Sequence, residues 1–168
     1  MKKECTHISG PAKALMLALT GCLAVLSCGC GKAKTLHDVS ASRRDWLLKV
    51  GLLATNETIL EFVVPAGITE QEKGVFYTDR RVAEYWSPVD PKRWKVQPYT
   101  WFSEYPDVTN VSPWISSDPL WGYMHGVVIE SAPAEYFRLH ITADKRFARG
   151  FAERLSNEWR RAQSKRSQ

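Results

Sequence analysis

Two histidines of a predicted β-hairpin are the first residues whose type and spacing suggest chemistry. In one of two possible turn registers, His125 and His140 face each other on the polar side of the hairpin, beside Tyr136 and Arg138. Facing imidazoles can begin a metal site or an acid–base pair. The other register separates the two rings, and the sequence supplies no clear third ligand. We therefore interpret both histidines as half-exposed sheet residues and expect no metal site.

Residues 85–123, rich in aromatic residues and proline, are the best candidate for a binding surface. They contain ten aromatic residues and six prolines. Proline at this density excludes a long helix or a central strand, so we expect a long loop with short turns. Tryptophan and tyrosine rings stack on sugars and peptides, but they also fold inward as small cores. Both interpretations stay open for the five rings selected as ligand-binding candidates: Trp94, Tyr99, Trp101, Trp114 and Trp121.

The local motifs of common catalytic sites are absent from the sequence. There is no Gly-x-Ser-x-Gly, no glycine-rich phosphate loop and no His-Glu-x-x-His. All four cysteines lie in the first thirty residues, so the later chain has neither a thiol nucleophile nor a disulfide. We predict a protein that is not an enzyme and needs no cofactor.

The first thirty residues have the composition of a secretory leader. Lysine is frequent in residues 1–13, residues 14–27 carry no charge, and the chain becomes polar again at Lys32. This is the order of the basic, apolar and small-residue regions of a signal peptide. A membrane-spanning helix needs about 20 apolar residues, and the uncharged run is shorter than that.

The end of the apolar run resembles the signal of bacterial lipoproteins, in which a small residue precedes a cysteine that receives a lipid. Val25-Leu26-Ser27-Cys28 and Leu19-Thr20-Gly21-Cys22 both fit this pattern. Cleavage before Cys28 uses the whole apolar run and leaves no apolar segment on the mature end. We therefore prefer Cys28, with Cys22 and then Cys30 as alternatives.

This resemblance covers residues 1–30 only. It implies a diacylglycerol on the Cys28 sulfur, an acyl chain such as palmitate on its amino group, and a chain tethered to a membrane. In a double-membrane bacterium, Gly29 after the cysteine favours the outer membrane.

The rest of the chain divides into a spacer and one predicted domain. Residues 28–44 are rich in glycine, lysine, alanine and serine, and they predict a flexible tether. The domain covers residues 45–168, of which 163–168 are expected to fray. Alternating apolar residues predict strands at Thr58–Val64, around Val75–Tyr77, at Tyr123–Glu130 and at Glu135–Thr142.

The predicted hairpin has two registers that bury the same face. With the turn centred between Ala132 and Pro133, Val128 faces Phe137. The alternative shifts the pairing by two residues, so the apolar face survives.

The clearest helix follows the hairpin. With Thr142 as N-cap, apolar residues recur at helical spacing (Phe147, Phe151, Leu155) and arginines cover the other side. Residues 143–168 carry eight basic and three acidic side chains. The basic face is either solvated or within reach of anionic lipid or cell-wall polymer.

A chain of 168 residues with 44% hydrophobic residues suits one domain. We predict an α+β fold, with a small antiparallel sheet, an amphipathic C-terminal helix packed on it and the long aromatic loop. The function that we infer is a lipid-anchored cell-envelope protein with a binding or assembly role. The alternatives are a cell-wall or glycan-binding module using the 85–123 loop, and a periplasmic hydrolase without a recognisable motif. We expect cell-wall polymer or another envelope protein as partner, and no nucleic acid.

Overall fold

The computed structural model describes residues 33–36, 38–65, 68–87, 97–116, 125–133, 135–142 and 144–168, without the side chains of Lys34 and Leu36. The predictions for the cysteines at positions 5, 22, 28 and 30 and for Trp94 and Trp121 lie outside these residues. None of the described helices combines the length and apolar character needed to cross a bilayer.

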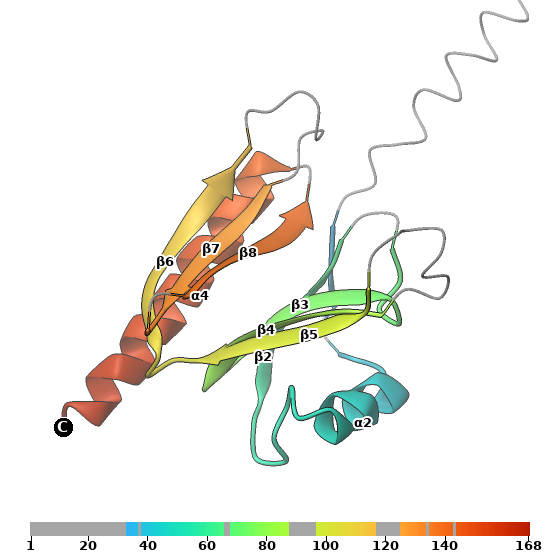
Figure 1. Ribbon diagram of the computed structural model, residues 1–168, viewed down its shortest axis with the longest axis horizontal. Helices are drawn as coiled ribbons and strands as arrows, with labels where there is room; N and C mark the ends of the chain where they lie inside the picture. Colours follow the sequence, from blue (N-terminus) through green and yellow to red (C-terminus); the bar gives the residue numbers. More distant parts are fainter. Residues whose placement is uncertain are drawn as a thin grey trace, which may run out of the picture. The chain divides into compact units, whose positions relative to one another are not determined.

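Two antiparallel sheets and two helices form the described fold (Figure 1). The five-stranded sheet has the order β1-β2-β3-β4-β5. Its strands are Lys34–Leu36 (β1), Ile59–Val64 (β2), Lys73–Thr78 (β3), Arg81–Trp86 (β4) and Tyr99–Glu104 (β5). The three-stranded sheet consists of β6 (Val108–Ile115), β7 (His125–Ser131) and β8 (Glu135–Thr142), in that order. The helices are α2 (Ala41–Lys49) and α4 (Lys145–Arg166). This arrangement confirms the predicted α+β class.

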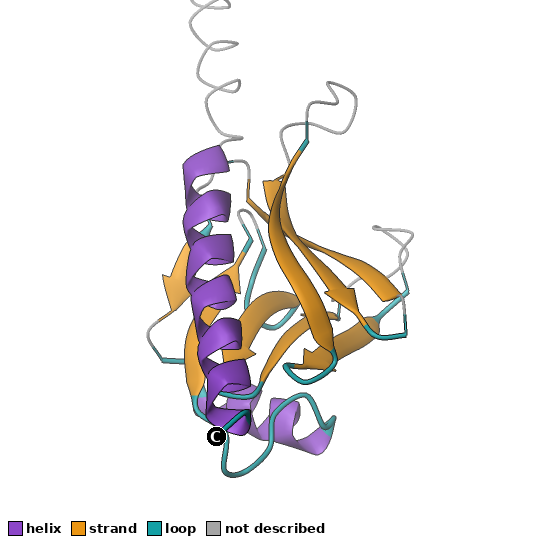
Figure 2. Cartoon of the chain, turned by 90° about the vertical axis from the view of Figure 1, so that its left-hand side faces the viewer, coloured by secondary structure: helices purple, strands orange, loops and turns teal. Residues whose placement is uncertain are grey.

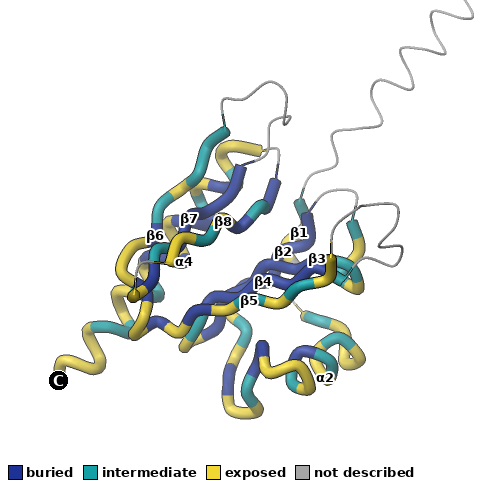
Figure 3. The backbone as a smooth tube through the Cα atoms, in the orientation of Figure 1, coloured by how far each residue is buried: buried dark blue, intermediate teal, exposed yellow. Residues whose placement is uncertain are grey.

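The five-stranded sheet is buried on both faces, as Figure 3 shows for its inner strands. On one face, Phe62 and Phe76 pack with Leu47 of α2. Gly74 belongs to this face because a Cβ there would lie 2.5 Å from the Phe62 ring and 2.7 Å from the Tyr85 ring. Side chains alternate across a strand, so the neighbouring residues of β2 and β3 supply a second core on the opposite face.

Helix α4 closes the second core and confirms the predicted amphipathic helix. Phe151 and Leu155 are fully buried, and the helix lies along the three-stranded sheet (Figure 2). Its N-cap is Asp144 rather than Thr142, because the Asp144 carboxylate accepts from the backbone N–H of Arg146 at 2.8 Å. The helix continues to Arg166, through part of the tail that we expected to fray.

An ion pair joins α4 to the five-stranded sheet. The Arg154 guanidinium binds both carboxylate oxygens of Glu61, at 2.9 and 2.7 Å. The Tyr77 hydroxyl donates to the same carboxylate at 3.0 Å. Because Glu61 is buried, these two partners replace the water that its charge would otherwise need.

The folded part begins earlier than the predicted tether of residues 28–44 allows. Strand β1 pairs with β2, and α2 starts at Ala41. The Ser40 side chain caps α2 by accepting from the Arg43 N–H, and Val39 packs on the core beneath the helix. The tether prediction is therefore wrong from Lys34 onward.

The prediction of one long loop at residues 85–123 also needs correction, because β5 and β6 lie within it. Both strands are sheet edges, where proline is tolerated. Pro113 lies inside β6, and Pro106 lies in the turn between the two strands.

The β7–β8 hairpin adopts neither predicted register. Val128 pairs with Arg138 rather than with Phe137, and the chain crosses from Ser131 to Glu135 through three residues. Both predicted registers require an even number of loop residues, whereas the observed loop has an odd number. A shift of one residue exchanges the two faces of a strand, so Val127 and Ile129 now face the core.

Candidate functional site

The structure places the three described aromatic candidates in two different environments. Trp101 stacks on Phe137, with ring centroids 4.1 Å apart and planes at 5°. Tyr99 meets Phe137 edge-on, at 6.4 Å and 69°. Both rings therefore pack between β5 and β8, in agreement with the interpretation that these aromatic rings fold inward as a small core. Trp114 instead lies on β6 and faces away from that core.

A buried ion pair lies beside the Tyr99 ring. The Glu84 carboxylate is 0% exposed, and its Oε1 lies 2.7 Å from the Lys73 ammonium. The Tyr99 side chain lies close enough to the same carboxylate for the two groups to influence each other's pKa. Burial raises the pKa of Glu84, although Lys73 and Tyr99 act in the opposite direction. Burial and the charge of Glu84 raise the pKa of Tyr99. This network fixes the relative positions of β3, β4 and β5.

The outer side of the three-stranded sheet carries a continuous row of aromatic and basic groups. We call it the aromatic–arginine face and define it as Trp114, Tyr136, Arg138 and His140. The Arg138 guanidinium carbon lies 5.4 Å from the Trp114 ring centroid and 5.3 Å from that of Tyr136. His140 meets Trp114 edge-on at 4.9 Å. Cation–π contacts on both sides thus hold Arg138 between two rings.

Strand register explains why these residues meet. Trp114, Gly126 and His140 are neighbours across β6, β7 and β8. Gly126 carries no side chain, so nothing stands between the Trp114 and His140 rings. The even-numbered residues of β8 share one face, which brings Tyr136 and Arg138 into the same row.

Beside Tyr136 the surface is hollowed at the hairpin end of the sheet. This cavity has a volume of about 420 Å³, and its lining residues are Thr109, Glu130, Ser131, Ala132, Pro133, Glu135 and Tyr136. Glu130 is held by the Asn110 side-chain amide at 3.0 Å. Tyr136 is 55% exposed although Arg138 contacts its ring and donates to its hydroxyl at 3.3 Å, so one end of the aromatic–arginine face offers an exposed ring next to two carboxylates.

The two histidines, interpreted from the sequence as half-exposed residues, do not oppose each other, and His125 is buried. His125 pairs with Thr142 and His140 with Gly126, so the two imidazoles are not opposed in the observed register. Burial, followed by the charges of Lys73 and Arg138, lowers the pKa of His140. Within the described ranges, no group of three potential metal ligands occurs.

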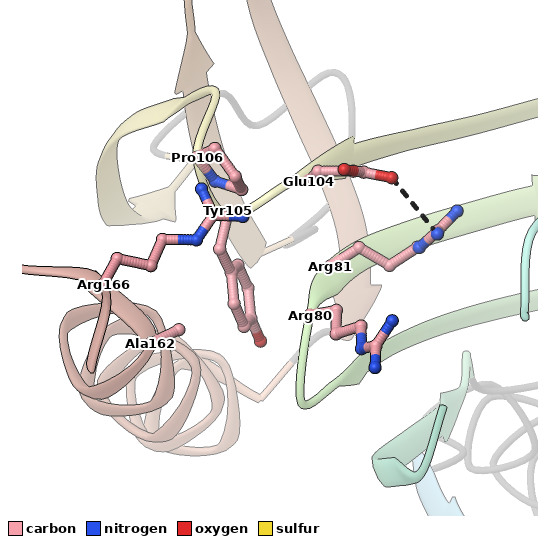
Figure 4. Close-up of a pocket in the computed structure, with 7 residues that line it drawn as sticks. All are labelled: Arg80, Arg81, Glu104, Tyr105, Pro106, Ala162 and Arg166. Carbon is pink, nitrogen blue, oxygen red and sulfur yellow. Dashed lines mark ion pairs between the residues drawn. The ribbon is translucent and has the colours of Figure 1, made fainter. Parts of the chain in front are cut away.

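A second cavity, of about 300 Å³, lies where the end of α4 meets the turns of the five-stranded sheet (Figure 4). Arg80 and Arg81 lie on one side of the Tyr105 side chain and Arg166 on the other. Arg81 is neutralised by the buried Glu57 at 2.8 Å and by Glu104 at 3.2 Å. The Tyr105 hydroxyl donates to the backbone of Thr78, and Gln163 of α4 donates to the carbonyl of Tyr105, both at 2.8 Å. These contacts anchor the helix to the sheet.

The sequence did not lead us to select Tyr136 and Arg138 as candidate binding residues, although a signal was present. Their alternation with Phe137 and Leu139 placed them on the polar face of the predicted strand. What the sequence lacked was the partner strand, because β6 lies in the segment expected to be loop.

Comparison of the chain with protein-family models, with curated proteins and with solved structures gives no match.

Proposed function

We propose that this chain is a lipid-anchored cell-envelope protein with a binding or assembly role, and that it is not an enzyme. The basic and apolar leader supports secretion, and the small residue before Cys28 supports a lipid on that cysteine. Cys22 is the alternative anchor. In a double-membrane bacterium the address is the outer membrane, and no nucleic acid is available there as a partner.

The ligand that the geometry favours is a cell-wall glycan bound on the aromatic–arginine face. The single observation that carries this choice is the exposed Tyr136 ring, in line with Arg138 and Trp114 and beside a hollow with two carboxylates. Aromatic rings stack on the apolar faces of sugars. Carboxylates accept hydrogen bonds from hydroxyl groups, and Glu130 and Glu135 are placed to do so.

This proposal moves the glycan site away from most of the residues first selected. Tyr99 and Trp101 are engaged with Phe137, whereas the half-buried Trp114 belongs to the aromatic–arginine face. Among the described residues, strand β8 contributes the most exposed aromatic ring, Tyr136.

Co-sedimentation with purified cell wall tests the proposal. We expect the unmodified chain to sediment with the wall, and Tyr136→Ala and Trp114→Ala each to weaken binding by about tenfold, because each removes one stacking surface. Phe102→Ala is the matched control, since Phe102 is an exposed aromatic residue (44%) on the five-stranded sheet. The control should bind as the unmodified chain does.

Two results would contradict the glycan assignment. One is absence of sedimentation by the unmodified chain. The other is equal loss in Phe102→Ala, which would show that any exposed ring contributes. Retention of binding in Tyr136→Phe, which keeps the ring, would support stacking over hydrogen bonding by the hydroxyl.

A further inference from the structure

The first turns of α4 carry a group of exposed cations. We call Lys145, Arg146 and Arg149 the basic end of α4. All three side chains are exposed, and none forms an ion pair with another described residue. The acidic groups nearest in sequence are Asp144, which caps the helix, and Glu153, which is exposed.

Helix stability does not explain these cations. The N-terminus of a helix carries a partial positive charge, so acidic side chains are favourable there and basic ones are not. Apart from its N-cap, Asp144, helix α4 has no acidic residue at its start, and it has three basic residues among its first five. A negatively charged partner would remove this conflict.

The basic end of α4 lies at the end of the fold where the described chain begins. Ala33, just before β1, and Phe147, in the first turn of α4, pack against the same core. Figures 1 and 2 both show the start of β1 and the start of α4 at one end of the described fold.

Only a short stretch of chain separates this end from the proposed anchor. Strand β1 begins at Lys34, so six peptide steps link it to Cys28. At no more than about 3.6 Å per residue, these steps span roughly 20 Å. A lipid on Cys28 therefore keeps the start of β1 within that distance of the bilayer.

We propose that the basic end of α4 rests on the anionic headgroups of the membrane that holds the lipid anchor. The inference depends on the lipid anchor of the proposed function, and it adds the orientation of the domain and the chemistry of its second membrane contact. A lipid chain combined with a basic patch is a common way to hold a domain on a bilayer. The aromatic–arginine face lies on the side of the three-stranded sheet opposite α4, and it does not take part in this contact.

Energy transfer to the bilayer surface tests the orientation. The lipidated chain, with Glu153→Cys carrying a donor dye and Cys30→Ser removing the competing thiol, is incorporated into vesicles that contain an acceptor dye at the headgroups. One set is phosphatidylcholine alone, and the other contains about one third phosphatidylglycerol. We expect clearly higher transfer in the anionic vesicles, reversed by high salt because the contact is electrostatic.

Variants locate the contact. Lys145→Gln/Arg146→Gln/Arg149→Gln should lower the transfer in anionic vesicles to the phosphatidylcholine value. The matched control, Arg160→Gln/Lys165→Gln/Arg166→Gln, removes the same charge from the other end of α4 and should leave the transfer high.

The outcomes separate the inference from the proposed function. A chain that fails to attach even to phosphatidylcholine vesicles lacks the anchor, which contradicts both. A chain that attaches but shows equal transfer in the two vesicle types contradicts only the orientation. An equal effect of the two triple variants also overturns it, because general charge attraction would then suffice.

Discussion

Three buried carboxylates help to fix the arrangement of the elements. Glu57, Glu61 and Glu84 are each buried, and each meets a cation from a different element: Arg81, Arg154 and Lys73. A buried charge without its partner is strongly destabilising, so each pair accepts only one arrangement of its elements. The pairs thus help to set the relative positions of these elements.

His140 gives the first prediction, a dependence of stability on pH. Its pKa in the folded chain is lowered from 6.5 by burial, then by Lys73 and Arg138. Just below pH 6.5 the unfolded chain therefore binds a proton that the folded chain does not, and the free energy of unfolding rises with pH in that window. In the His140→Gln variant, the free energy of unfolding should rise less with pH in this window.

Urea unfolding of both chains between about pH 5.5 and 7 measures this difference. Glu84, whose pKa is raised, contributes with the opposite sign, so only the comparison of the two chains isolates His140. Identical slopes in the two chains would show that His140 does not titrate differently on folding.

At the scale of elements, the pattern of apolar residues predicted what alternation and helical periodicity can reveal. Strand β2 and helix α4 are found where the sequence placed them. The hairpin register could not be predicted, because it depends on whether the loop holds an odd or even number of residues. Strands β5 and β6 were missed because proline excludes only central strands, and the sequence does not show which strands are edges.

The candidate site could likewise be predicted only in part from the sequence. Trp114 was selected from composition, but its neighbours His140 and Arg138 come from a strand 24 or more residues later, brought close by pairing through β7. Long-range pairing of this kind has no local signature. The proposed lipid anchor, by contrast, depends on a pattern of consecutive residues, so the sequence alone suggests it.

Two glycines give opposite predictions at this scale. A Cβ at Gly126 would overlap the carbonyl oxygen of Leu139, a backbone atom that cannot move without breaking the sheet. Gly126→Ala should therefore destabilise the chain by about 1–3 kcal/mol or more. A Cβ at Gly150 meets only the Arg154 Nη1 atom at 3.1 Å, an atom that is not used in the bonds to Glu61.

Gly150→Ala should consequently stabilise the chain, by about 0.5–1 kcal/mol, because alanine replaces glycine inside a helix. Thermal or urea unfolding of the two variants measures both effects. Gly126→Ala with unchanged stability would contradict the observed pairing of β7 with β8.

At the scale of the whole molecule, the chain combines two proposed surfaces with one proposed anchor. The basic end of α4 lies near the start of the described chain, whereas the aromatic–arginine face covers the outer side of the three-stranded sheet. A short tether would hold the first surface against the bilayer and leave the second free for a polymer of the envelope. Both assignments require that the chain reaches the envelope.

Lipid labelling is therefore the most direct test of the account. Cells that express the chain are supplied with a labelled fatty acid, and the unmodified chain is compared with Cys28→Ser and Cys22→Ser. We predict that the unmodified chain and Cys22→Ser carry the label and partition with membranes, and that Cys28→Ser does neither. A Cys28→Ser chain that keeps both the label and its membrane partition, or an unmodified chain that stays unlabelled in the cytosol with Met1 in place, would contradict the central claim.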